Sequence, residues 1–293
     1  MAQKSERGAI APIVTVLVAA GIAWAGSQEG IAVGGVPVFA LAIGLAFLVQ
    51  WLAFIPSYML QTERYFDLIG SLTYISVMTL TIIVSGATDA RSILLLVLVL
   101  VWAGRLGPFL FRRVRRAGKD DRFDEIKGSF LRFFTTWTLQ GLWISLTLAA
   151  ALAAVTSIQP KEIDTFAFVG LAIWVLGFSI EAVADWQKSR FRADPANKGH
   201  FISTGLWAWS RHPNYFGEIV LWTGVAIIAL PMLSGWRLAT LISPVFVFLL
   251  LARVSGVPLL EKKADTRWGG QEAYEAYKRT TPVLVPLLGR KKA

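Results

Sequence analysis

The apolar residues of this chain come in eight long blocks rather than in the spaced stripes of a soluble helical protein. Each block approaches the ~20 residues that a helix needs to cross the ~30 Å hydrocarbon core of a bilayer. The sequence therefore predicts an all-α fold, a polytopic membrane bundle of seven to eight transmembrane helices. The blocks are Ile10–Ala25, Val36–Ile55, Leu68–Val84, Ile93–Phe111, Phe130–Val155, Phe166–Trp186, Tyr215–Met232 and Leu238–Val257.

Composition agrees with a membrane protein and excludes several kinds of chemistry. The chain is 55% hydrophobic and 16% charged, and it contains no cysteine. Disulfides, thiolate nucleophiles, iron–sulfur clusters and cysteine-ligated zinc are therefore excluded. Two histidines argue against a histidine-ligated metal. We expect no metal site.

Basic residues exceed acidic ones, 29 to 19, which could suggest a nucleic-acid partner. Their placement follows membrane topology instead. With a cytoplasmic N-terminus, the outside segments keep little beyond Lys161 and the boundary residues Arg91 and Arg237, as the positive-inside rule expects. We predict cytoplasmic termini, the inner (cytoplasmic) membrane, no nucleic-acid partner and no obligate protein partner. The inside segments hold Lys4, Arg7, Arg64, Arg112 to Lys127, Lys188 to Arg211 and the basic tail after Pro258.

One membrane domain accounts for residues 1–293, and its two parts differ in polarity. The spans of residues 1–128 carry almost no ionisable residues in their middles, whereas residues 129–293 carry many. An apolar side beside a polar side suits a lipid-like substrate and a charged cofactor. The alternative, that the first part is only a scaffold, stays open. We also expect the first block to be retained rather than cleaved as a signal peptide, because no convincing small-residue cleavage site precedes the next span and removal would upset the charge alternation.

A polar stretch, Ser210 to Glu218, runs directly into the seventh block. Pro213 fits the first turn of a helix, so Arg211 and His212 would precede a helix N-terminus that favours anions. Asn214 and Glu218 are spaced i, i+4, and the Glu218 carboxylate could cap ribose hydroxyls or hold a neighbouring arginine. This is the strongest candidate binding site in the sequence.

Two carboxylates, Glu181 and Asp185, share one face of the sixth block. Charged groups inside membrane helices usually face a bundle interior or a watery cavity and mark function, although pairing with Arg105 or Arg253 would also explain them. The loop that follows interleaves Arg, Asn, Lys and Gly and could wrap phosphates. Contact with anionic lipid headgroups is the alternative for this loop.

Three further features carry candidate residues. In the tail, Tyr274 and Tyr277 share a helical face ahead of Lys278 and Arg279, which fits a binding role or an interfacial amphipathic helix. In the connector Gln61 to Asp67 and in the third block, Glu63 and Tyr74 could donate protons if they face a cavity. Arg105 interrupts the fourth block and must meet a carboxylate, a phosphate or the membrane interface.

No Gly-x-Gly-x-x-Gly or phosphate-loop motif is present, so any dinucleotide would be bound by helix ends and loops. Neither histidine lies near a Gly-x-Ser-x-Gly turn, and no Ser-His-Asp arrangement stands out.

Several motifs together resemble the DUF1295 family, which belongs with the steroid 5α-reductase C-terminal superfamily. The resemblance covers about residues 60–288. More distantly, the Arg-His-Pro-x-Tyr-x-Gly stretch and the tyrosine-bearing tail are similar to isoprenylcysteine carboxyl methyltransferases and sterol reductases. The motifs are Ala184-Asp-Trp-Gln, Asp194-Pro-Ala-Asn-Lys-Gly, Thr204-Gly-Leu-Trp, Ser210-Arg-His-Pro-Asn-Tyr-Phe-Gly-Glu and the Tyr-x-x-Tyr-Lys tail.

The resemblance implies an all-helical membrane reductase that binds NADPH and passes a hydride to the alkene of an enone, such as a 3-oxo-Δ4 steroid. The hydrophobic substrate would lie among the N-terminal spans. An arginine of the steroid-reductase pattern matches Arg105. By match to the family motifs, the other implied cofactor contacts are Asp185, Arg190, Asn197, Arg211, His212, Asn214, Tyr215, Glu218, Tyr277, Lys278 and Arg279.

The proton-donating side departs from that pattern. Steroid reductases carry a Gln-Glu pair and a tyrosine about three residues before the arginine, whereas this chain has the spaced pair Gln61-x-Glu63 and places Trp102 there. Tryptophan cannot donate a phenolic proton. Either Tyr74 or Tyr65 polarises the carbonyl, or the substrate is not a 3-oxo-Δ4 steroid. The catalytic candidates are Gln61, Glu63 and Tyr74.

Two other functions stay open. An S-adenosylmethionine-dependent methyltransferase acting on a prenylated or lipid carboxylate would share the Arg-His-Pro-x-Tyr-x-Gly stretch. NADPH carries phosphates that need cationic partners, whereas S-adenosylmethionine carries none, so the Arg and Lys density at 188–211 and 278–279 favours NADPH. A lipid-binding or scaffolding protein would leave the buried carboxylates without a purpose.

Overall fold

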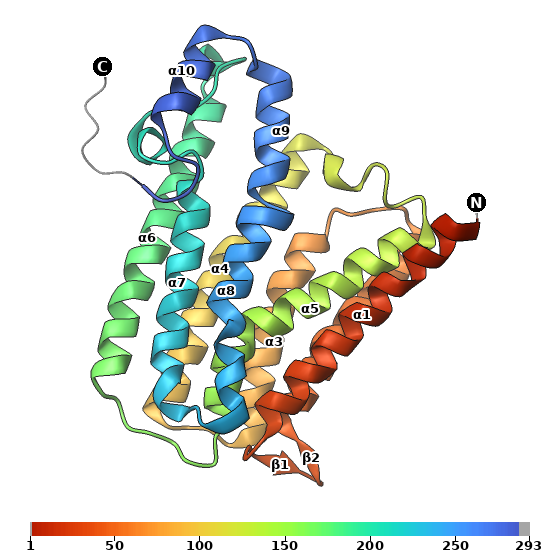
Figure 1. Cartoon of the computed structure of the whole chain (residues 1–293), viewed down its shortest axis with the longest axis vertical. Helices are drawn as coiled ribbons and strands as arrows, with labels where there is room; N and C mark the ends of the chain where they lie inside the picture. Colours follow the sequence, from red (N-terminus) through yellow and green to blue (C-terminus); the bar gives the residue numbers. More distant parts are fainter. Residues whose placement is uncertain (1, 287–293) are drawn as a thin grey trace. The chain divides into compact units, whose positions relative to one another are not determined.

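Helices make up almost the whole structure, a computed structural model that describes residues 2–286 and the side chains of residues 10–286 (Figure 1). The side chains of Lys4 and Arg7 and the basic residues after residue 286 lie outside these ranges, so the topology predicted from them is not tested. The helices are α1 (Ala2–Ser27), α2 (Val38–Met59), α3 (Phe66–Ser85), α4 (Ala90–Ala117), α5 (Phe130–Val155), α6 (Thr165–Ala193), α7 (Pro213–Ala229), α8 (Ile242–Leu249), α9 (Val257–Trp268) and α10 (Glu272–Thr280).

The described residues contain little sheet. One short antiparallel hairpin joins α1 to α2, with β1 (Ala32–Val33) paired to β2 (Val36–Pro37) so that Ala32 faces Pro37 and Val33 faces Val36. Gly34 and Gly35 form its turn, and both have positive φ angles, which glycine adopts at no steric cost. The predicted all-α fold class is confirmed.

Within residues 2–286, eight helical stretches are long and apolar enough to cross a membrane, and they coincide with the eight predicted blocks. The protein is therefore an integral, multi-pass membrane protein. Several stretches extend past the predicted ends, because polar side chains continue a helix after its apolar run stops; α4 reaches Ala117 and α6 reaches Ala193. If all eight cross, the chain returns to the side on which it began. Which side that is, and which membrane, stay predictions.

The eighth stretch, Gly235–Trp268, is not one regular α-helix. A 3-10 helix (Gly235–Leu241) leads into α8, a π-helical turn (Leu250–Val254) follows, and α9 begins at Val257. At the break, a Cβ on Gly256 would lie 2.5 Å from the carbonyl oxygen of Leu251, so only glycine fits there. Pro258 in the first turn of α9 has no N–H to continue the preceding helix.

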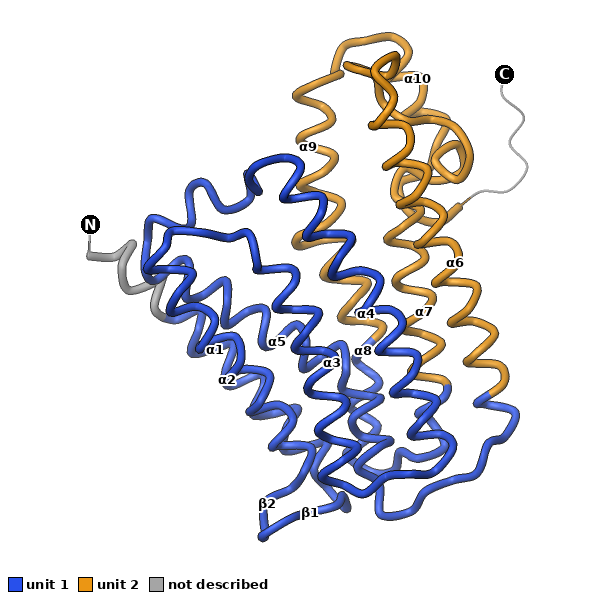
Figure 2. Tube along the Cα trace, turned by 180° about the vertical axis from the view of Figure 1, so that it is seen from behind, with its two compact units in different colours: residues 1–167, 228–243 blue, residues 168–227, 244–293 orange. Residues whose placement is uncertain are grey.

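The chain forms two compact units (Figure 2). Unit 1 comprises residues 1–167 and 228–243, and unit 2 comprises residues 168–227 and 244–293. The first boundary between the units thus falls at 167/168, in the first turn of α6, whereas the functional division expected from polarity lies at 128/129. That division concerns the roles of the two parts and stays a prediction.

Helix α5 is the centre of unit 1. In its most apolar window 89% of the residues are buried, against 44% or less in α1 to α4. Its second half is a run of alanines and leucines, and Ala149 to Ala153 are fully buried. Small side chains let neighbouring helices approach closely, so α1, α2 and α3 all pack on α5.

Two buried arginines fasten the connecting loops of unit 1. Arg91, in the first turn of α4, donates to the carbonyl oxygen of Ile228 at 2.7 Å and pairs with Asp164 at 2.8 Å. Arg237 donates to the carbonyl oxygens of Glu29 and Ala153. Both side chains are 2% exposed or less. A buried guanidinium requires such partners, so these two residues have a structural role.

In unit 2, helices α6 and α7 approach backbone to backbone. A Cβ on Gly217 would lie 2.6 Å from the amide nitrogen of Glu181, and one on Gly177 would lie 2.4 Å from that of Leu221. Gly224 lies equally close to the backbone of Trp174. These three glycines set the distance between α6 and α7, and they bring the carboxylates of α6 beside the start of α7.

Candidate functional site

The turn before α7 is held by the chain that follows α10. Arg211 donates its backbone N–H to the carbonyl oxygen of Pro282 at 2.9 Å. Ser210 donates its hydroxyl to Leu284 at 2.8 Å and accepts the N–H of His212 at 3.1 Å. Pro213 is the first residue of α7, as predicted. Hydrogen bonds to the chain after α10 and the start of α7 therefore hold this turn in place without a ligand.

Glu261, on α9, contacts two side chains of this turn. One carboxylate oxygen lies 2.7 Å from Nε2 of His212, and the other lies 3.0 Å from Nη1 of Arg211. The sequence analysis missed Glu261. The only sequence feature that indicates Glu261 is its position one turn after Pro258, in a segment that the charge pattern assigns to the basic tail. Glu261 connects the seventh and eighth apolar stretches at the site.

His212 is 4% exposed, and its ring stacks on that of Tyr215 at 5.7 Å. Burial lowers the pKa of His212 below its usual value, and the hydrogen bond to Glu261 opposes that shift. Because an ionised carboxylate can only accept, the shared proton lies on Nε2 of a neutral imidazole. Its Nδ1 then carries a lone pair that can accept a hydrogen bond.

Three neighbouring residues each bury a polar atom that has no hydrogen-bond partner within the described part of the chain. These atoms are Nε of Arg211, Nδ1 of His212 and Oδ1 of Asn214. Nearly all buried polar atoms in proteins are hydrogen-bonded, so three such atoms within four residues are candidates to bind a polar ligand. One is a cationic donor and two are acceptors, which fits a group that combines phosphate with hydroxyl or amide functions.

Helix α6 contributes its carboxylates to the same region. The amide of Asn214 donates to Oδ1 of Asp185 at 3.3 Å, so the structure brings together two residues proposed from separate motifs. Asp185 is 6% exposed and Glu181 is 2% exposed. Glu218, one turn into α7, is half-buried.

The loop after α6 is shaped by local hydrogen bonds. Gln187 accepts the N–H of Leu206 at 3.0 Å, and the indole N–H of Trp207 donates to Ala184 at 3.0 Å. Asn197 donates its amide to the carbonyl oxygen of Phe191 at 3.1 Å, and the guanidinium of Arg190 lies 5.5 Å from the centre of the Trp186 ring. Arg190 thus contacts its own helix, α6, and Asn197 bonds back to the last turn of α6.

The tail residues pack on that loop. Tyr277 donates its hydroxyl to the carbonyl oxygen of Trp207 at 2.6 Å, and burial raises its pKa. Lys278 pairs with Asp265 of α9 at 2.7 Å. Arg279 is exposed on α10. Helix α10 is therefore anchored to the rest of unit 2 through Tyr277 and Lys278, while Arg279 is accessible.

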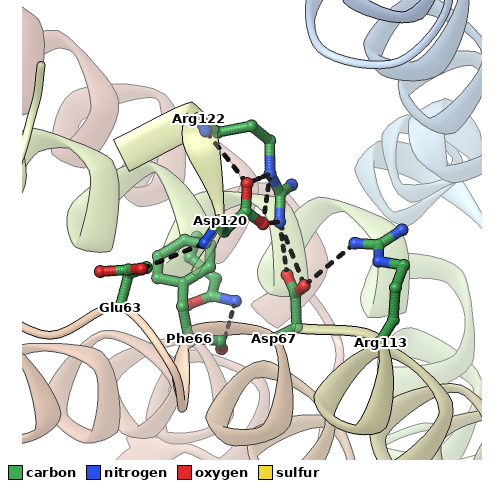
Figure 3. Close-up of polar contacts among 7 residues, drawn as sticks. Glu63, Phe66, Asp67, Arg113, Asp120 and Arg122 are labelled. Carbon is green, nitrogen blue, oxygen red and sulfur yellow. Dashed lines mark hydrogen bonds and ion pairs between the residues drawn. The ribbon is translucent and has the colours of Figure 1, made fainter. Parts of the chain in front are cut away.

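The catalytic candidate Glu63 belongs to an ionic cluster between the α2–α3 and α4–α5 connections of unit 1 (Figure 3). One carboxylate oxygen accepts the backbone N–H of Asp120 at 3.1 Å, and the other lies 3.0 Å from Nζ of Lys127. Burial alone would raise the pKa of Glu63, but these two hydrogen bonds outweigh it and lower the pKa. Glu63 is therefore an ionised carboxylate.

The other candidates of unit 1 lie on separate elements. Gln61 has a positive φ of 50° just after α2, and its side chain donates to the carbonyl oxygen of Tyr58. Tyr74, on α3, is 6% exposed, and its ring meets that of Trp102 edge to face at 5.0 Å. Arg105, on α4, lies 5.4 Å from the Phe109 ring. Tyr74 thus contacts the tryptophan that replaces the expected tyrosine.

The fold and the site define an all-α, multi-pass membrane protein with a polar site at the start of α7. The chain belongs to the DUF1295 family, described as "Protein of unknown function (DUF1295)", whose model matches residues 53–281. This confirms the resemblance inferred from the motifs.

Three curated relatives match shorter segments. The chain is 28% identical over 120 residues to 3-oxo-5-alpha-steroid 4-dehydrogenase 1 of Mus musculus, covering 41% of each chain. It is 30% identical over 96 residues to "Probable O-methyltransferase ustE" of Ustilaginoidea virens, covering 32% of this chain and 34% of that protein. An uncharacterised protein of Schizosaccharomyces pombe is 27% identical over 110 residues, 35% of this chain and 38% of its own length. The chain thus spans about two fifths or less of these relatives. No solved structure matches it.

Proposed function

We propose that this protein is an NADPH-dependent integral-membrane reductase that saturates the C=C bond of a hydrophobic enone. A 3-oxo-Δ4 steroid or a sterol-like lipid is the preferred substrate class, so the enzyme would be an oxidoreductase acting on CH–CH donors. The observation that carries this proposal is the cluster of Arg211, His212 and Asn214, each with a buried polar atom that lacks a partner within the described residues. The steroid dehydrogenases among the relatives support it.

The cofactor side belongs to unit 2. Arg211 and the N-terminus of α7 favour a phosphate, while Asn214 and Asp185 offer an amide and a carboxylate to hydroxyl or amide groups. When bound, NADPH supplies the hydride. Glu261 keeps Arg211 and His212 in place for binding. We assign cofactor recognition, on a site that faces the cytoplasm, to Asp185, Arg190, Asn197, Arg211, His212, Asn214, Tyr215, Glu218, Tyr277, Lys278 and Arg279 of unit 2. Arg105, which the resemblance adds to the cofactor contacts, belongs to unit 1, and its role stays a prediction.

The carbonyl-polarising side draws on unit 1. We assign it to Gln61, Glu63 and Tyr74, of which the donors Gln61 and Tyr74 would stabilise negative charge on the carbonyl oxygen of the substrate. Tyr74 is the proton donor of this set, because a phenolic O–H donates a hydrogen bond whereas an ionised carboxylate only accepts. Glu63, being ionised, would orient neighbouring donors, and the Gln61 amide would add a second donor.

A second candidate function is an S-adenosylmethionine-dependent isoprenylcysteine or lipid methyltransferase. The observation that favours it is the match to a protein named as a probable O-methyltransferase, at 30% identity. S-adenosylmethionine has a sulfonium and no phosphate, so it would use fewer of the cationic groups at this site than the phosphates of NADPH would. That difference favours NADPH.

The deciding experiment is a thermal-unfolding assay of the detergent-purified chain with NADPH, NADH and S-adenosylmethionine in parallel. A ligand that binds only the folded state raises the unfolding temperature. We expect NADPH to stabilise the wild-type protein, and we expect Arg211→Ala and Asn214→Ala to lose that stabilisation. Stabilisation by S-adenosylmethionine alone would refute the reductase proposal in favour of the methyltransferase. Wild-type NADPH affinity in both variants would refute the assignment of Arg211 and Asn214 to the cofactor site.

A further inference from the structure

The last turns of α4 carry three exposed arginines, Arg112, Arg115 and Arg116. Spacings of three and four residues place them on one face of the helix. Within the described part of the chain, none of the three forms an ion pair. Three positive charges are thus left unbalanced at one helix end.

The neighbouring basic residues differ, because internal carboxylates neutralise them. Arg113 and Arg122 pair with Asp67 at 3.6 and 3.1 Å (Figure 3). Lys119 pairs with Asp124 at 2.5 Å, and Lys127 pairs with Glu63 at 3.0 Å. Those basic residues hold the α2–α3 and α4–α5 connections together. The three arginines of the exposed face serve no such purpose.

The length of α4 places these arginines beyond the hydrocarbon core. Its 28 residues extend about 42 Å, whereas the core is ~30 Å thick. The end of α4 therefore reaches the headgroup region. Beside the arginines, the ring of Phe111 stacks on that of Tyr65 at 5.7 Å, and Tyr65 is 50% exposed. Exposed tyrosines next to basic residues are typical of the membrane–water interface.

We propose that Arg112, Arg115 and Arg116, with the Tyr65–Phe111 ring pair, bind the headgroups of anionic phospholipids. Guanidinium groups donate paired hydrogen bonds to phosphate oxygens, and this face offers three of them without a competing carboxylate. A zwitterionic lipid is bound less well, because its ammonium group is repelled by the same charges. None of these five residues is among those assigned to the cofactor or to catalysis.

The test measures thermal unfolding of the detergent-purified full chain during titration with palmitoyl-oleoyl phosphatidylglycerol, phosphatidylcholine or inorganic phosphate. We expect phosphatidylglycerol to raise the unfolding temperature of the wild-type protein and the other two additives to leave it unchanged. The triple variant Arg112→Gln, Arg115→Gln, Arg116→Gln should bind phosphatidylglycerol at least about tenfold more weakly, since each surface arginine adds to the attraction. Because the three side chains are exposed, its unfolding temperature without lipid should match the wild type.

A charge-matched control replaces three other exposed basic residues, Lys161→Gln, Lys262→Gln and Arg267→Gln. It should keep the wild-type response to phosphatidylglycerol. An equal loss of phosphatidylglycerol binding in this control would mean that the net charge of the protein, and not this surface, determines binding. That result would overturn the proposal. Equal stabilisation by phosphatidylcholine or by inorganic phosphate, or an undiminished response of the α4 triple variant, would also overturn it. If the triple variant does not fold, Arg115→Gln alone must show a weaker response.

Discussion

Nε2 of His212 lies 2.7 Å from Oε1 of Glu261, so a buried imidazole at the start of α7 is held by a carboxylate 49 positions later in the chain. The same carboxylate pairs with Arg211 through its second oxygen. One side chain of α9 thus fixes both the ring orientation of His212 and the position of the Arg211 guanidinium. It leaves Nδ1 of His212 and Nε of Arg211 for a ligand.

Glu261→Gln should weaken NADPH binding by about 10- to 100-fold, because hydrogen bonds to charged groups contribute roughly 1.5–3 kcal/mol and a neutral amide with one oxygen cannot accept from both His212 and Arg211 as the carboxylate does. The affinity is measured by titrating NADPH while following the fluorescence of the bound nicotinamide. The control is Glu272→Gln on α10, where an exposed carboxylate is replaced by the same amide. Wild-type affinity in Glu261→Gln would show that Glu261 does not position the cofactor site.

Protonation of His212 should destabilise the protein at acidic pH. Burial lowers the pKa of His212 in the folded state. As the pH falls through about 6.5, His212 therefore becomes protonated in the unfolded chain before it does in the folded chain. The contribution of His212 to stability is therefore complete above that pH and is lost as the pH falls through it. Thermal unfolding between pH 5 and 8 checks this: His212→Gln should show a flatter dependence than the wild type.

The second histidine of the chain provides the matched control for this pH dependence. His200 is exposed, and His200→Gln should follow the wild-type profile. Parallel profiles for all three proteins would mean that His212 does not titrate differently in the folded and unfolded states.

The eight spans could be predicted from sequence because long apolar runs follow directly from the thickness of a bilayer. The start of α7 could be predicted for a similar reason, since Pro213 belongs in a first helical turn. The contact between Asn214 and Asp185 needed the tertiary structure, although both residues had been selected from their own motifs.

Glu261 and the breaks around α8 could not be predicted, for different physical reasons. Apolar periodicity does not distinguish an α-helix from the π-helical turn at Leu250–Val254, because lipid-facing residues are apolar in both. Glu261 stands among basic residues and looked like part of a solvated tail. Only the packing of α9 against the turn before α7 makes that carboxylate the partner of His212.

Gly217→Ala should destabilise the protein by about 1–3 kcal/mol, since a new methyl group would meet the backbone of α6 at 2.6 Å and the helices would have to separate. Because this glycine sets the spacing that brings Asp185 to Asn214, NADPH affinity should fall as well. Denaturation in detergent and the NADPH titration measure the two effects. Gly104→Ala on α4 is the control, since no atom lies within 4 Å of a Cβ there, and it should leave both quantities unchanged.

Tyr74→Phe tests the proton-donating side, because it removes only the hydroxyl and keeps the ring against Trp102. If Tyr74 is the donor, kcat for a 3-oxo-Δ4 steroid should fall by about 10²-fold, while the KM for NADPH stays the same. Steady-state kinetics with the purified enzyme gives both values. Tyr58→Phe, which also keeps its ring packed on Phe54, is the control and should retain full kcat. Full activity in Tyr74→Phe would show that another group polarises the carbonyl of the substrate. The better substrate class would then be an enone whose carbonyl needs no phenolic donor.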